Sequence, residues 1–107
     1  MNSLSGAVIS AGIAVHRELG PGLLESLYQK CLSCELTVRG YAVRNEVELP
    51  LRYGSVVLEG AYRLDLLVES QIVVETKTVE RVLPVHRAQL LTCSKLADCR
   101  LGLLINF

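Results

Sequence analysis

Hydrophobic and polar positions along the chain follow two different periods, one typical of helices and one typical of strands. Apolar side chains recur every three or four residues near the start, at Leu4, Val8, Ala11, Val15 and Leu19. This spacing predicts a helix over residues 3–19 that begins at Ser3, a common capping residue. Gly20-Pro21-Gly22 then interrupts the pattern sharply.

A second helix is predicted from about residue 22 to 38, with Gly40 as its stop signal. Its apolar stripe is expected to contain Leu24, Leu27, Cys31, Cys34 and Val38. Because free cysteines behave as small hydrophobic residues, both cysteines fit a buried stripe.

From residue 42 the period shortens to two, as in half-buried strands. Strands are predicted over 42–52 and 56–68, joined by a turn at Tyr53-Gly54-Ser55, with Gly60 as a bend or bulge. A three-residue turn at 69–71 would then pair Val68 with Ile72 at the start of a strand over 72–78.

Pro84 suits the first turn of a third helix over about 84–97, and residues 101–105 predict a final buried strand. The order α-α-β-β-β-α-β predicts a mixed α/β fold in which helices flank a central sheet. Since the chain has no repeats or linkers, we expect residues 1–107 to form one domain.

Charge and composition narrow the classes of function only in part. Eleven basic residues balance eleven acidic ones, so attraction to nucleic acid would have to come from a local patch. No apolar run has the length of a membrane span, and no signal-like segment opens the chain. We therefore expect a cytoplasmic protein without a membrane partner, whose four cysteines are reduced.

The most informative charged residues lie on the two strands around the 69–71 turn. The predicted register places Asp65 opposite Glu75, and Lys77 shares the face of Glu75 because it lies two positions further on. Two carboxylates that face each other among leucines and valines repel each other and lose hydration.

A divalent cation would offset this repulsion, because carboxylate oxygens suit Mg²⁺ or Mn²⁺. Lys77 could then neutralise charge, orient a water molecule or stabilise a developing phosphorane. The alternative is a structural network of acids and a lysine, which short motifs of this kind often mark.

Six segments spread over nearly the whole chain resemble the GxxExxY family. Its name-giving motif matches Gly22-Leu23-Leu24-Glu25-Ser26-Leu27-Tyr28. The other matching segments are Val15–Pro21, Tyr62–Val68, Val74–Lys77, His86–Leu91 and Leu101–Phe107. That family is similar to the PD-(D/E)xK nuclease superfamily, which includes RecB-like nuclease domains. The resemblance implies a restriction-endonuclease-like mixed sheet flanked by helices, and metal-dependent hydrolysis of phosphodiester bonds in DNA.

The resemblance also implies roles for particular residues. It implies a metal site formed by Asp65, Glu75 and the carbonyl oxygen of Thr76. It implies catalytic roles for Lys77, for Glu25 on the second helix and for Gln89 on the third helix.

Four further residues are candidates for contact with a substrate. Arg63 lies two positions before Asp65 on the same strand face and could contact a scissile phosphate. Tyr28 can share a helix face with the candidate acid three residues earlier, and His86 lies one turn before the candidate glutamine. His16 falls inside a matching segment, which suggests a place close to the site.

Ordinary structural roles stay open for the helix-borne candidates. An acid in the first turn of a helix, such as Glu25, is favoured by the helix dipole, and so is His16 near a helix end. His86 and Gln89 could simply face solvent or cap the third helix.

The cysteines allow one more kind of site. Cys31-x-x-Cys34 and Cys93-x₅-Cys99 could together bind zinc or an iron–sulfur cluster, although packing as buried hydrophobic residues is favoured. Cys93 stands where the pattern of the family usually has an aromatic residue. This departure could weaken stacking on a substrate or merely change the packing.

The leading hypothesis from the sequence is therefore a Mg²⁺- or Mn²⁺-dependent nuclease acting on DNA. The alternative is a non-catalytic module that keeps the nuclease fold to bind nucleic acid or protein. A positive mean hydropathy of +0.37 also leaves room for a homodimer that buries apolar surface.

Overall fold

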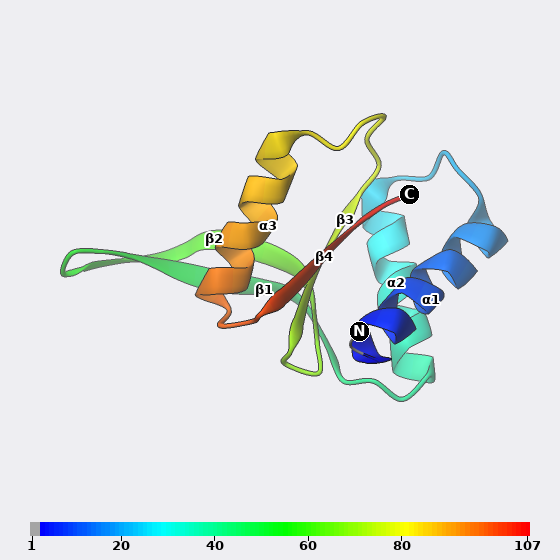
Figure 1. Ribbon diagram of the computed structural model, residues 1–107, viewed down its shortest axis with the longest axis horizontal. Coiled ribbons are helices and arrows are strands. Elements are labelled where there is room, and N and C mark those ends of the chain that lie inside the picture. Colours follow the sequence, from blue (N-terminus) through cyan, green and yellow to red (C-terminus); the bar gives the residue numbers. More distant parts are fainter. Residues whose placement is uncertain (1–2) are drawn as a thin grey trace.

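The computed structural model describes residues 3–107 and contains the helices and strands in the predicted order. They are α1 (Ser3–Leu19), α2 (Glu25–Val38), β1 (Val43–Tyr53), β2 (Val56–Val68), β3 (Ile72–Lys77), α3 (Pro84–Leu96) and β4 (Leu101–Asn106). Three helices flank one mixed sheet, which confirms the expected restriction-endonuclease-like α/β class (Figure 1).

The sheet has the strand order β1-β2-β3-β4. The two hairpin pairs, β1 with β2 and β2 with β3, are antiparallel, whereas β3 and β4 are parallel. A parallel pair needs a crossover connection, and α3 provides it. The turn between β2 and β3 has the predicted register, with Val68 paired to Ile72.

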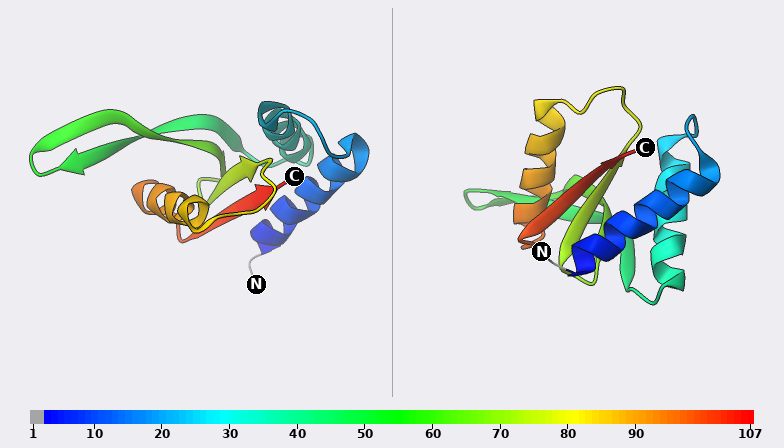
Figure 2. Two further views of the ribbon diagram at one scale, coloured as in Figure 1. Left: turned by 90° about the horizontal axis from the view of Figure 1, so that it is seen from above. Right: turned by 45° about the vertical axis from the view of Figure 1, so that its right-hand side comes forward.

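The outer part of the β1–β2 hairpin projects away from the helices as a long arm, which gives the molecule a longest extent of 47 Å (Figures 1 and 2). The register shifts within this arm, because Leu49 pairs with Tyr62 but Leu51 pairs with Leu58. Pro50 has no N–H to donate, so a bulge suits this place. Gly60 has a φ of 62°, which confirms the predicted bulge.

One face of the sheet is covered by α1 and α2. Its fully buried core joins the two helices to β2 and β3 through Val8, Ala11, Leu32, Leu36, Leu66, Val68, Ile72 and Val74. The predicted stripe of α1 is confirmed in its middle, where Val8, Ala11 and Val15 are buried.

The prediction for α2 was wrong in two respects. The helix begins at Glu25 and not near residue 22, because Gly22 has a φ of 97° and Leu24 is extended. Its buried side is the line of Tyr28, Leu32 and Leu36.

The predicted stripe of α2 instead lies largely in contact with solvent. Leu24 is 71% exposed and Val38 is 85% exposed. Cys31, Cys34 and Val38 line an open hollow between α1 and α2. Two apolar lines run along α2, and the line with the longer side chains packs on the sheet.

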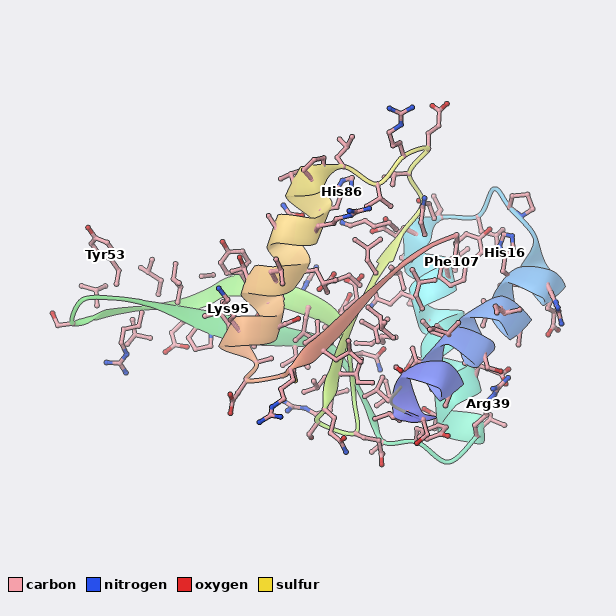
Figure 3. All side chains as sticks on the ribbon, viewed as in Figure 1. His16, Arg39, Tyr53, His86, Lys95 and Phe107 are labelled. Carbon is pink, nitrogen blue, oxygen red and sulfur yellow. The ribbon has the colours of Figure 1, made fainter. Side chains whose placement is uncertain are left out.

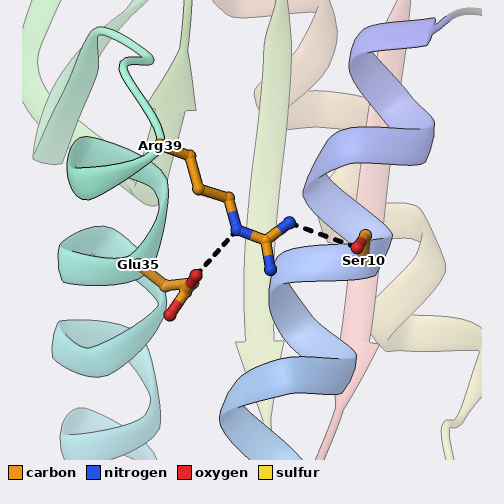
Figure 4. A network of polar contacts seen from close by, with 3 residues as sticks. All are labelled: Ser10, Glu35 and Arg39. Carbon is orange, nitrogen blue, oxygen red and sulfur yellow. Dashed lines mark hydrogen bonds and ion pairs between the residues drawn. The ribbon is translucent and has the colours of Figure 1, made fainter.

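A polar network connects the end of α2 to α1. Arg39 donates hydrogen bonds to Glu35 (Nε to Oε2, 2.7 Å) and to Ser10 (Nη1 to Oγ, 3.1 Å) (Figure 4). The partly exposed ion pair of Arg39 with Glu35 lies at the end of α2 and contributes about 1 kcal/mol or less, whereas the bond to Ser10 reaches α1.

Within residues 3–107, the opposite face of the sheet is covered by α3 alone. The helix approaches β4 closely at Gly102, where an added Cβ would lie 2.5 Å from Ser94 Oγ and 2.8 Å from Leu90 Cδ1. This close contact fixes the height of α3 above β3 and β4. Between residues 3 and 107 no helix has both the length and the apolar character needed to cross a membrane.

Candidate active site

The site begins where β2 and β3 separate. Their ladder ends at the pair Leu66 and Val74, one position before Asp65 would pair with Glu75. In place of the next ladder bond, Oδ2 of Asp65 accepts hydrogen bonds from the backbone N–H (2.8 Å) and the hydroxyl (3.0 Å) of Thr76. The carboxylate of Asp65 is therefore fixed in the fork between the two strands.

Glu75 lies beside Asp65, half-buried on the α3 side. Its Oε1 is buried and has no hydrogen-bond partner in the part of the chain that the structure describes. Burial raises the pKa of Glu75 to about 8, and the charge of the neighbouring Asp65 adds to the rise. The charge of Lys77 lowers this pKa, but by less.

An open hollow of about 290 Å³ lies between β2, β3 and α3. Asp65, Glu75 and Lys77 line it together, as the sequence analysis predicted. A carboxylate pair, a lysine ammonium and open solvent access are thus combined at one place. This combination can bind a cation and an anionic group side by side.

Three more predicted residues line the same hollow: Arg63 from β2, and His86 and Gln89 from α3. Nδ1 of His86 accepts the Leu83 N–H at 3.0 Å and thereby caps the start of α3. This bond leaves Nε2 as the remaining donor of the ring. Figure 3 shows His86 near the start of α3, at the opposite end from Lys95.

Glu25, the first residue of α2, lies next to the end of β3 and does not line the hollow. Its Oε1 accepts the backbone N–H of Thr78 at 3.2 Å. Glu25 is also the acidic residue in the first turn of α2, where the helix dipole favours it.

The structure places Tyr28 and His16 outside the hollow. The ring of Tyr28 is fully buried and stacks on Phe107 at a centroid distance of 4.6 Å, while its hydroxyl donates to the carbonyl of Gly20. His16 lies 6.2 Å from the same phenylalanine ring (Figure 3). Both residues therefore lie around Phe107 and not among the lining residues of the hollow.

Sequence reasoning missed other residues that line the hollow. Tyr62 and Ala61 belong to it although they lie next to the bulge, where the strict alternation of strand faces that the prediction used does not hold. Cys93 was not missed: the sequence analysis marked it as the departure from the family pattern that could affect stacking, and it is buried against the same hollow, one helical turn after Gln89. Burial, followed by the charges of Glu75 and Asp65, raises the pKa of the Cys93 thiol.

The donors present fit a hard divalent cation. The unpartnered Oε1 of Glu75 and the adjacent Asp65 provide two carboxylates, and such ions also accept carbonyl, water and phosphate oxygens. No group of three or more His, Cys, Asp or Glu placed to hold a metal occurs within residues 3–107. All four cysteine thiols are free.

A family model described as the PD-(D/E)XK nuclease superfamily matches residues 2–107, and the chain therefore belongs to that superfamily. Nucleases of this superfamily generally use divalent metal ions. The membership agrees with the resemblance found in the sequence and with the mixed sheet. No curated protein and no solved structure matches the chain significantly.

Proposed function

We propose that this protein is a Mg²⁺- or Mn²⁺-dependent nuclease that hydrolyses phosphodiester bonds in DNA at the hollow between β2, β3 and α3. The observation that carries the proposal is the buried Oε1 of Glu75, which has no hydrogen-bond partner among the described residues and lies beside Asp65 at an open hollow. Without a cation a group in such a place keeps its proton, whereas a bound cation would satisfy the oxygen and favour the charged carboxylate.

Asp65, Glu75 and the carbonyl oxygen of Thr76 would hold the ion. When bound, the ion would supply Lewis-acid activation of the phosphodiester and neutralise charge. Thr76 contributes further, because its two hydrogen bonds hold Asp65 in the fork of the strands.

The other lining residues would act on the substrate. The ammonium group of Lys77 would orient the attacking water and stabilise negative charge as the water adds to phosphorus and the P–O bond to the leaving sugar oxygen breaks. The water would lose its proton to solvent, and the leaving oxygen would take one from solvent. Arg63 would contact the scissile phosphate, and Gln89 and His86 Nε2 would donate hydrogen bonds from α3. Glu25 would have its catalytic role next to the end of β3, where its carboxylate accepts the N–H of Thr78.

Two finer assignments belong to the same proposal. Within the superfamily we assign the chain to the GxxExxY group, on the matching segments from Gly22–Tyr28 to Leu101–Phe107. We place its action on DNA in the cytoplasm, as the sequence analysis predicts. The Tyr28 and His16 side chains would support the site through Phe107.

Calorimetric titration with Mn²⁺ and Mg²⁺ tests the proposal most directly. The wild type should bind Mn²⁺, with and without DNA present, and Asp65→Asn should abolish the binding. Asp98→Asn is the matched control, because Asp98 is exposed and does not line the hollow.

Cleavage of single- and double-stranded DNA with Mn²⁺ then tests catalysis. Lys77→Ala should lower the rate about 10²–10³-fold, the usual effect of removing one charge-stabilising donor. Lys95→Ala, at an exposed lysine of α3 (Figure 3), should leave the rate unchanged. No metal binding and no cleavage by the wild type would instead favour a non-catalytic binding module.

A further inference from the structure

The backbone that follows Lys77 is held by contacts from residues distant in the sequence. Lys77 is the last residue of β3, and its carbonyl accepts the N–H of Phe107 at 2.8 Å. Strand ends usually fray, because they have a neighbour on one side only. Here the chain turns away toward α3, yet the next two residues are also fixed.

The Asn106 side chain forms hydrogen bonds with both backbone polar groups of Val79, two residues after the end of β3. Its Oδ1 accepts the N–H of Val79 at 2.9 Å, and its Nδ2 donates to the carbonyl of Val79 at 2.7 Å. A carboxamide can make this pair of bonds because it carries a donor and an acceptor side by side. The side chain therefore replaces the strand partner that Val79 lacks.

Two further contacts connect this pair of Asn106–Val79 bonds, the Asn106 clamp, to α2. Glu25 at the start of α2 accepts the N–H of Thr78, the residue between Lys77 and Val79. Phe107 stacks on the buried ring of Tyr28, with an angle of 4° between the ring planes. Residues 77–79 are thus held between the end of β4 and the start of α2.

We propose that Asn106 is a positioning residue for Lys77 in the reaction, an inference that rests on the proposed nuclease function. Lysine has a long flexible side chain, so the position of its ammonium depends on how firmly its backbone is held. Residues 78–83 also lead into α3, which carries His86 and Gln89 over the same hollow. The amide of Asn106 fixes the joint between these two parts of the site.

Kinetics of Asn106→Ala and Asn106→Asp test this inference. Both variants should lower kcat about 10- to 100-fold, because displacing a reacting group by about 1 Å can cost 10²-fold in rate. The aspartate keeps the shape and the acceptor but loses the donor, so it covers the case in which the alanine variant does not fold. KM for DNA and the Mn²⁺ affinity should stay within about two-fold, because Asp65 and Glu75 precede the clamp.

Asn45→Ala is the matched control. Asn45 is equally an exposed asparagine on a strand and also makes a side-chain hydrogen bond, to Ser33 Oγ at 2.9 Å, but it does not line the hollow. Its removal should leave kcat unchanged. An equal loss of kcat in this variant would overturn the positioning role of Asn106.

A double variant shows whether Asn106 acts through Lys77. In the Lys77→Ala background, Asn106→Asp should cause a much smaller loss of rate than in the wild type, because Lys77, the main group that it positions, is gone. Additive losses would overturn the inference and indicate a general effect on the fold.

Amide hydrogen exchange separates the clamp from the reaction. The Val79 N–H should be protected in the wild type and exchange at least about tenfold faster in Asn106→Ala, whereas the Val74 N–H within β3 should change little. Unchanged exchange at Val79 would overturn the clamp while leaving the nuclease proposal intact. A wild type that shows the protection but neither binds Mn²⁺ nor cleaves DNA would overturn the nuclease function, and with it the role of Asn106 in a reaction.

Discussion

The two faces of the sheet differ in burial and charge, although β2 and β3 contribute residues to both. Toward α1 and α2, β2 and β3 present Leu66 and Val74, which are fully buried among apolar side chains. Toward α3, the neighbouring positions Asp65 and Glu75 line an open hollow. Because successive side chains of a strand point to opposite faces, a shift of one position separates a dry core from a charged site.

The difference follows from how many helices cover each face. Two helices cover the first face, and their contacts leave the core residues without solvent. Among the described elements, only α3 covers the second face, so β2 and β3 stay partly open beside it. The stability supplied by the first face allows the second to keep Glu75 in a place that raises its pKa to about 8.

The largest expected effect comes from opening a cavity in the closed face. Leu66→Ala should lower the free energy of unfolding by about 2–5 kcal/mol, because Leu66 is fully buried. Leu58→Ala on the same strand is the control, since Leu58 is 48% exposed, and it should cost about 0.5 kcal/mol. Urea unfolding measures both; equal costs would mean that the two ends of β2 are equally buried.

A smaller effect is expected where α3 approaches the sheet. Gly102→Val should cost about 1–3 kcal/mol, because its side chain would overlap Ser94 and Leu90. It should also lower cleavage by moving α3, and with it Gln89, away from the acid pair. The control is Leu91→Ala, on the exposed side of α3. Gly54→Ala does not serve, because the φ of Gly54 is positive. Unchanged stability and cleavage would contradict the close approach.

The open face also predicts an unusual dependence of stability on pH. The folded protein keeps the Glu75 proton up to pH about 8, whereas the unfolded chain releases it near its ordinary pKa of 4.5. The folded state binds more protons between these values, so this group makes the metal-free protein less stable as pH rises from 4.5 to 8. Above pH about 8 Glu75 is ionised in both the folded and the unfolded state, and the full loss of stability is present.

Glu75→Gln should remove this dependence, because the amide cannot ionise. In buffer with a chelator, the variant should gain melting temperature relative to the wild type, and the gain should grow from pH 5 to pH 8.5. Glu59→Gln, on the exposed arm, should show no such trend. A difference that stays constant with pH would show that Glu75 titrates normally.

Much of this comparison could be predicted from the sequence, because strand alternation and turn length are local signals. They gave the order of the elements, the pairing of Val68 with Ile72 and the grouping of Asp65, Glu75 and Lys77. The end of the ladder at Leu66 was not predictable, because it depends on Asp65 turning to bind Thr76.

Contacts between distant segments were also beyond prediction. The match to Gly22–Tyr28 marked Tyr28 as notable, but a motif does not say which way a side chain points, and the ring packs on Phe107. The clamp by Asn106 joins residues 27 positions apart. A polar residue at the end of an apolar strand carries no local sign of such a partner.

The smallest expected effect concerns the face of α2 that the sequence analysis misassigned. Cys34 is exposed, so Cys34→Ser should change the free energy of unfolding by about 0.5 kcal/mol or less. Leu32, two positions earlier, is fully buried, and Leu32→Ala should cost about 2–5 kcal/mol.

Thiol labelling of the native protein offers a second measurement, since Cys34 should react quickly. Cys93 should react slowly, because it is buried at the base of the hollow and burial and the charges of Glu75 and Asp65 raise its pKa. Equal rates at the two cysteines would mean that the Cys93 thiol is not buried between α3 and the sheet.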